Sequence, residues 1–221
     1  MDILTLQEKL DKKRRMALGF FPTPFYKLEN LSRELGINLF IKRDDFTGQN
    51  LFGGNKVRKL EFLLGQAVEA GAEYVFTYGA TQSNHAMQTA AASRKLGLKP
   101  VLYLLALVEP DESLFESTER YMELARRRMK ELEDEGYKCW SIPLGGADHI
   151  GTAGFIAGYT ELSLQLACEQ LKLDYIFHAN GSGGTMAGLV AGRQLLGEET
   201  QIVSVDAAKH SESFSREAAR L

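Results

Sequence analysis

The segment Gly53-Gly54-Asn55-Lys56 decides how this chain is interpreted, because a lysine that follows flexible residues can alternate between bonded and free positions. Two later segments, residues 81–85 and 181–185, place small or polar residues where a helix is expected to begin. Backbone N–H groups at a helix start have no partner within the helix and favour anions. One movable amine and two candidate anion sites therefore indicate a lysine that forms an imine with a phosphorylated aldehyde. Pyridoxal 5'-phosphate is the obvious candidate.

Five motifs follow one another along the chain. They are Phe21-Pro22-Thr23-Pro24, Ile41-Lys42-Arg43-Asp44-Asp45, Gly53-Gly54-Asn55-Lys56-Val57-Arg58-Lys59-Leu60-Glu61, Gly79-Ala80-Thr81-Gln82-Ser83-Asn84-His85 and Ser182-Gly183-Gly184-Thr185. In these residues and in this order the chain resembles the pyridoxal-phosphate-dependent D-cysteine desulfhydrase and 1-aminocyclopropane-1-carboxylate deaminase family. That family has the tryptophan synthase β-like fold of the fold type II enzymes.

Apolar runs alternate with helical patterns, which predicts parallel α/β layering. Strands are expected at residues 39–42, 74–78, 101–107, 138–142, 175–179 and 202–205, and helices at 57–70, 83–96, 112–135 and from 184 onward. The resemblance implies an α/β fold of open, mainly parallel, twisted sheets with flanking helices in two domains. The large cofactor-binding domain would comprise residues 1–56 and 145–221, and the small domain residues 57–144, with the cofactor in the cleft between them.

Lys56 is the first candidate catalytic residue. Taken alone, Gly-Gly-Asn is most simply a turn followed by an exposed lysine. The resemblance reverses this interpretation, since it implies that Lys56 holds pyridoxal phosphate as an internal aldimine and, once substrate has displaced it, shuttles the Cα proton. Positive charge from Arg58 and Lys59, which follow in the sequence, would lower the pKa of Lys56 and favour its neutral amine.

The residues Ser83, Asn84 and His85 open a helix directly after a strand. Ser83 can cap this helix. The resemblance implies that all three contact the substrate, that Ser83 takes part in catalysis, and that Asn84 also bonds the ring hydroxyl of the cofactor. Met87 stands where the family usually has an arginine, which leaves the exact substrate open.

The loop at residues 181–185 lies between an apolar strand and a helix, and its glycines let the backbone approach a phosphate closely. The resemblance assigns the cofactor phosphate to Gly181, Ser182, Gly183, Gly184 and Thr185. A rival interpretation is a dinucleotide-binding fingerprint made of Gly181, Gly183 and Asp206. Met186 occupies the position of the third glycine of that fingerprint, and the loop comes late in the chain.

Four weaker candidates are also visible. Asp148 and His149 could form a polar pair near the cleft, although a loop Asp-His pair is more often exposed. Asp44-Asp45 lacks the histidines or third carboxylate that a metal site needs, so no metal is expected. His178 is expected to pack at the core or cleft edge, and Tyr78 could either face the cofactor or pack.

The resemblance implies a lyase or deaminase that acts on a small amino acid. A D-cysteine desulfhydrase-like enzyme would release 2-oxo acid, ammonia and sulfide, and the residues 81–85 favour this branch over a 1-aminocyclopropane-1-carboxylate deaminase-like one. Relative to the family, a helix and a strand are missing after residues 101–107, and the chain stops soon after residues 202–205. We therefore expect a chain shortened internally and truncated at its C-terminus, with an incomplete large domain. A catalytically silent relative and a nucleotide-binding α/β module are the alternatives.

The bulk composition of the 221 residues excludes several partners. A net charge of −3 argues against a nucleic-acid surface, and no apolar run has membrane-spanning length. Cys139 and Cys168 fall in a predicted strand and a predicted helix without metal-like spacing, so two buried thiols are expected. A cytoplasmic protein is predicted, with a small amino acid as its substrate and a homodimer as the family's usual assembly.

Overall fold

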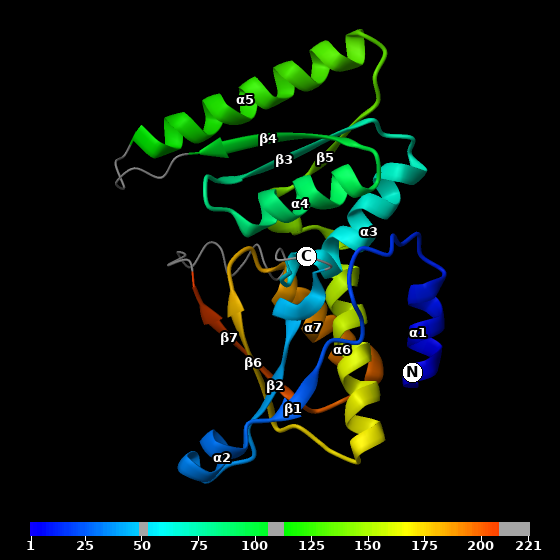
Figure 1. Cartoon of the computed structure of the whole chain (residues 1–221), viewed down its shortest axis with the longest axis vertical. Helices are drawn as coiled ribbons and strands as arrows, with labels where there is room; N and C mark the ends of the chain where they lie inside the picture. The colour runs from blue at the N-terminus through cyan, green and yellow to red at the C-terminus, as the bar shows by residue number, and fades with distance from the viewer. Residues whose placement is uncertain (49–52, 106–112, 208–221) are drawn as a thin grey trace.

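The computed structural model describes residues 1–48, 53–105 and 113–207, with side chains in the last range from residue 120 onward (Figure 1). Its helices are α1 (Ile3–Asp11), α2 (Glu29–Leu35), α3 (Lys56–Glu69), α4 (Asn84–Lys95), α5 (Ser113–Asp134), α6 (His149–Glu169) and α7 (Gly184–Leu196). Its strands are β1 (Phe25–Lys27), β2 (Phe40–Lys42), β3 (Tyr74–Ala80), β4 (Lys99–Leu105), β5 (Cys139–Ile142), β6 (Tyr175–Asn180) and β7 (Gln201–Asp206). Two short 3₁₀ turns are η1 (Asp44–Thr47) and η2 (Leu144–Gly146).

The strands form three sheets. β4, β3 and β5 make a parallel sheet in that order, β6 and β7 make a parallel pair, and β1 and β2 make an antiparallel pair. In Figure 1 the three-stranded sheet lies between α5 and α4, while α6, α7 and the other two sheets lie below it. The predicted α/β class with mainly parallel sheets is confirmed.

All six predicted strands are present, with shifted ends. β4 begins two residues earlier than expected, and residues 106–107 of the predicted strand lie outside the described residues. The sequence analysis missed β1, because three residues directly after Pro24 are too short to show an alternating pattern. It also missed α1 and α2.

Helix α3 lies at the centre of the molecule and is buried on nearly all sides. One face packs in a cluster with the three-stranded sheet, through Leu60, Leu63 and Leu64. Its Phe62 packs in a second cluster with α1 and α6. A helix enclosed on all sides must also bury polar side chains, and Arg58, Lys59 and Glu61 are each at most 3% exposed. Each of these three side chains therefore needs a polar partner.

Arg58 finds its partners in two carboxylates. Its guanidinium makes paired hydrogen bonds to Asp44, at 2.7 and 2.8 Å, and to Glu161 on α6, at 2.9 and 3.0 Å. Lys42 also contacts Glu161, and the hydroxyl of Thr23 accepts a further bond from Arg58 at 3.1 Å. This cluster joins the N-terminal segment, α3 and α6. It also gives both carboxylates of the Asp44-Asp45 pair a partner, since Asp44 bonds Arg58 and Asp45 pairs with Arg43.

Glycines bring α6 into backbone contact with its neighbours. A Cβ on Gly154 would lie 2.3 Å from the carbonyl oxygen of Arg58, and a Cβ on Gly188 of α7 would lie 2.4 Å from the Cβ of Phe155. Real side chains cannot occupy such distances, so only glycine permits this spacing. The helices α3, α6 and α7 are therefore stacked closely enough to fix the two helix starts at Lys56 and Gly184.

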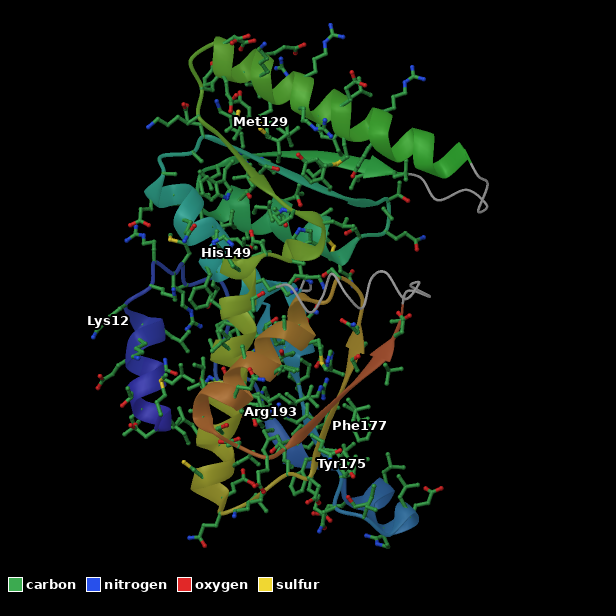
Figure 2. All side chains as sticks on the ribbon, turned by 180° about the vertical axis from the view of Figure 1, so that it is seen from behind. Lys12, Met129, His149, Tyr175, Phe177 and Arg193 are labelled. Carbon is green, nitrogen blue, oxygen red and sulfur yellow. The ribbon has the colours of Figure 1, made fainter. Side chains whose placement is uncertain are left out.

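One face of the β6–β7 pair is left uncovered by the described residues. Tyr175 and Phe177 are 52% and 65% exposed, and their rings stack with centroids 6.0 Å apart, as Figure 2 shows from behind. Parallel sheets are usually covered on both faces. Among the described residues, the other face of this pair is packed by α6 and α7 through Ile176 and Ile202.

The two cysteines lie in the predicted kinds of element, but the expected burial was wrong. Cys139 on β5 is half-buried, and Cys168 is exposed in the last turn of α6. The residues that pack α6 into the core end at Leu166, so the final turn of the helix faces solvent.

The Arg58 cluster generates a pH-dependent stability prediction. Burial alone would raise the pKa of Glu161, but hydrogen bonds and positive charge from Arg58 and Lys42 lower it from 4.5 to about 2. The contribution of Glu161 to stability is therefore fully present above pH 4.5 and is lost as the pH falls toward 2. We expect Glu161→Gln to lower the free energy of unfolding by about 3 kcal/mol at pH 7 and by less than half of that at pH 3.

Urea denaturation at both pH values measures this difference. Glu8→Gln on α1 is the matched control, because Glu8 is exposed and the charge change is the same. An equal loss for Glu161→Gln at pH 3 and pH 7 would contradict the assignment.

Candidate active site

Lys56 is the first residue of α3, and its amine donates a hydrogen bond to Oδ1 of Asn55 at 3.0 Å. Burial lowers its pKa. A Cβ on Gly145 would lie 4.0 Å from Cε of Lys56 and 2.6 Å from Oγ of Ser182. Lys56, the η2 turn and the loop after β6 therefore converge, although they are far apart in sequence. This convergence brings the lysine and the predicted phosphate loop into one site.

The loop at residues 181–185 ends at an uncapped helix. Gly183 has φ 79° and occupies the N-cap of α7, where no side chain in the described part of the chain makes a capping hydrogen bond. The N–H groups of the first turn of α7 therefore remain available to an anion. Thr185 in that turn accepts a long hydrogen bond, at 3.5 Å, from the side chain of Asn55. The segments before α3 and at the start of α7 are thus joined directly.

Lys59 is a site residue that the sequence analysis did not select. Its side chain is buried, and its amine donates to the carbonyl oxygen of Gly145 at 3.3 Å. A Cβ on Gly184 would lie 2.7 Å from that amine, so Lys59 sits directly beside the start of α7. Burial and the charge of Lys56 lower the pKa of Lys59 to about 7, against an opposing effect of Asp148. The spacing of three residues from Lys56 on a helix was the signal that could have found it.

The residues 83–85 have three different environments. Ser83 caps α4 as predicted, with its Oγ accepting from the N–H of Ala86 at 3.2 Å. Asn84 is exposed, whereas His85 is buried. Met87, the departure from the family pattern, is exposed on the first turn of α4. The predicted substrate loop therefore presents Asn84 to solvent and turns His85 inward.

His85 faces the two lysines. Its Nε2 lies 3.0 Å from the hydroxyl of Thr77, while its Nδ1 has no hydrogen-bond partner among the described residues. Burial, followed by the charges of Lys56 and Lys59, lowers its pKa to about 3, although the nearby backbone of Pro143 opposes this. The imidazole is therefore neutral at physiological pH.

The weaker candidates have different environments. Asp148 caps α6 by accepting from the N–H groups of Ile150 and Gly151, and His149 beside it is exposed at the start of that helix (Figure 2). His178 contacts the carbonyl of its neighbour and, at 3.4 Å, the sulfur of Met186. Tyr78 is buried on the α5 side of the sheet and packs there.

The packing of α7 weakens the dinucleotide interpretation. Met186 fills the position of the third glycine and contacts His178, which leaves no close helix–strand approach at this point. The close approach occurs instead at Gly188 and Gly192, where α7 packs on α6.

The described residues contain neither a cluster of metal-binding side chains nor a membrane-spanning helix. Within residues 1–48, 53–105 and 113–207, no three or more His, Cys, Asp or Glu side chains are arranged to hold a metal ion. In the same part of the chain, every helix is too short or too polar to cross a bilayer.

Comparisons with known proteins agree with this geometry. The family model described as "Pyridoxal-phosphate dependent enzyme" matches residues 16–220. A protein of Pyrococcus abyssi named "Putative 1-aminocyclopropane-1-carboxylate deaminase" is 41% identical, with 92% of this chain and 66% of that protein covered. A D-cysteine desulfhydrase of Serratia proteamaculans is 36% identical, with 93% and 68% covered.

Solved structures show the same relationship. The crystal structure of an ACC deaminase homologue superimposes with a TM-score of 0.85 at 36% sequence identity. The superposition covers 99% of this chain and 70% of the homologue's chain. A threonine deaminase at 20% identity and a TM-score of 0.61 shares the fold. The chain spans about two thirds of the length of the relatives it matches. It belongs to the pyridoxal-phosphate dependent enzyme family and has the α/β fold of the fold type II enzymes.

Proposed function

We propose that this chain binds pyridoxal 5'-phosphate through Lys56 and acts as a lyase or deaminase on a small amino acid. The observation that carries the proposal is the convergence of the half-buried Lys56 with Gly145 and Ser182, beside the uncapped start of α7. An amine whose pKa is lowered by burial is neutral more often than an exposed lysine, and only the neutral amine attacks an aldehyde.

The residues of the site fit the cofactor. The phosphate would bind the N–H groups at the start of α7, with Ser182 and Thr185 as hydroxyl donors and Lys59 as the buried cation. Because Gly145 and Gly184 have no side chains, Ser182 and Lys59 can approach the start of α7 this closely. Bound pyridoxal phosphate supplies an electron sink that makes the Cα proton of an amino acid acidic.

The chain's own residues would then position the substrate and move its proton. Lys56, once released, is placed to take up and return the proton at Cα. The start of α4 is the proposed site for the substrate carboxylate, with Ser83 and Asn84 as contacts, since the helix start favours an anion. Neutral His85 can offer its unpartnered Nδ1 as one hydrogen-bond donor or acceptor without adding charge.

Two substrates are consistent with the relatives, which are named for 1-aminocyclopropane-1-carboxylate and for D-cysteine. With D-cysteine, loss of the Cα proton would be followed by departure of sulfide from Cβ, and hydrolysis would give a 2-oxo acid and ammonia. With the cyclopropane amino acid, ring opening would precede loss of ammonia. We favour D-cysteine because of the residues 81–85. The alternative is that the chain is a catalytically silent relative. Release of pyruvate and sulfide from D-cysteine by the purified chain would exclude this alternative.

The proposal extends to organisation and location. We propose that residues 1–56 and 145–221 form the cofactor-binding domain and residues 57–144 the small domain, with the site between them. The proposed boundary at residues 56–57 falls in the first turn of α3, a helix that contacts both α4 and α6. A homodimer and a cytoplasmic location are proposed from the family resemblance.

Lys56→Ala is expected to abolish covalent attachment of pyridoxal phosphate, because the variant has no amine at the site. The measurement is borohydride reduction of the protein with added cofactor, followed by peptide mapping of the reduced adduct. Lys12→Ala, at an exposed lysine after α1, is the control and should keep the adduct on Lys56 (Figure 2). A full adduct in folded Lys56→Ala would remove Lys56 from the mechanism.

Lys59→Met tests the phosphate site separately. The probe is pyridoxine 5'-phosphate, which carries the phosphate but has no aldehyde. Removing a buried cation that bonds the phosphate should weaken binding about tenfold to a hundredfold at pH 6. With a pKa of about 7, Lys59 must take up a proton to bind an anion at pH 8.5, so the difference between wild type and variant should shrink there.

Isothermal titration at both pH values measures this change. Lys12→Met is the matched control and should bind as wild type does. Equal affinities of wild type and Lys59→Met at pH 6 would place the phosphate elsewhere.

A further inference from the structure

A cavity lies on the face of the three-stranded sheet that is opposite to Lys56. Side chains alternate along β3, so Thr77 faces His85 and α4, whereas Tyr78 faces α5. At the carboxyl-terminal ends of β3, β4 and β5, beside α5, this arrangement leaves a cavity of about 420 Å³. That volume falls in the range of small-molecule sites, which in open α/β sheets occur at this edge.

The walls of the cavity are apolar and aromatic. Leu105 and Met122 line it, and the exposed Leu144 lies at its rim. The rings of Tyr78 and Tyr121 meet edge to face, with centroids 6.1 Å apart and planes at 71°. A further aromatic ring can pack against such an edge-to-face pair. None of the described side chains that line the cavity carries a charge, so a zwitterionic amino acid or a phosphate finds no counter-charge among them.

One hydrogen-bonding position remains open in the cavity. The hydroxyl of Tyr121 is used twice, since it donates to the carbonyl of Tyr103 at 2.5 Å and accepts from the N–H of Gly79 at 3.0 Å. The hydroxyls of Tyr78 and Ser141 bond each other at 3.0 Å. Two hydroxyls that share one hydrogen bond keep one donor hydrogen and unused acceptor lone pairs. The pair can therefore bind one polar group of a ligand.

We propose that this cavity binds a neutral aromatic molecule that carries a single hydroxyl or N–H group, with that group on the Tyr78–Ser141 pair. This cavity lies on the opposite face of the three-stranded sheet from the proposed cofactor site. It also differs in chemistry, because its described lining is neutral and apolar whereas the cofactor site is cationic. The inference does not depend on the proposed function, and it is tested without cofactor or amino-acid substrate.

The test follows the methyl groups of methionine by NMR in the full chain during titration with para-cresol. The methyl of Met122, in the cavity wall, should shift and saturate, while that of Met129, further along α5, should not (Figure 2). Toluene has the ring without the hydroxyl and should bind about threefold to tenfold more weakly. Benzoate has a charge and should not shift Met122. The proposal would be overturned if the methyl signals of Met122 and Met129 both shifted without saturating. It would also be overturned if the methyl signal of Met122 did not shift at all.

Two substitutions of Ser141 sharpen the test. Ser141→Ala removes the hydroxyl and should weaken para-cresol about threefold to tenfold while leaving toluene unchanged. Ser141→Leu fills the cavity and should abolish binding of both. Ser141 is an exposed strand residue, so both variants are expected to fold. Ser204→Leu, at another exposed strand serine on β7, is the matched control and should leave para-cresol binding intact. Unchanged binding in Ser141→Leu would also overturn the proposal.

Discussion

The burial of Arg58 is the constraint on which the rest of the structure depends. A guanidinium that is 3% exposed must be neutralised, and the two carboxylates that do so come from η1 and α6. These bonds hold the N-terminal segment and α6 against the first turn of α3. Lys56 begins that same turn, so the position of its amine is fixed by a contact that lies outside the site. The predicted catalytic lysine is thus placed by a neighbouring salt-bridge cluster instead of by its own hydrogen bond.

Close helix packing transmits this constraint to the phosphate loop. Gly154 lets α6 touch the backbone of α3, and Gly188 lets α7 approach α6. The helix starts at Lys56 and Gly184 therefore belong to one stacked unit. The same unit excludes solvent from Lys59, and this burial is what separates its pKa from that of an exposed lysine. The burial of α3 therefore determines both how the three helices pack and how far the pKa of Lys59 is lowered.

The sequence predicted the features that depend on local chemistry. Ser83 caps α4, and the strands end where the motif loops begin. What it could not predict depends on contacts between distant segments. Arg58 and Glu161 are 103 residues apart, and neither position has a local signature. The role of Lys59 was visible as helical spacing, but its burial was not. The exposure of Cys168 likewise depends on where α6 leaves the core.

The pKa of Lys59 has a consequence for how ligand binding will be observed. A group that is about half protonated at pH 7 takes up part of a proton whenever an anion arrives beside it. The buffer must release that proton, and its heat of ionisation then adds to the heat of binding. Binding enthalpies measured in HEPES and in Tris, which have different heats of ionisation and do not compete as phosphates, would therefore differ although the affinity is the same. The slope of enthalpy against buffer ionisation heat then counts the protons that the buried amine has taken from solution.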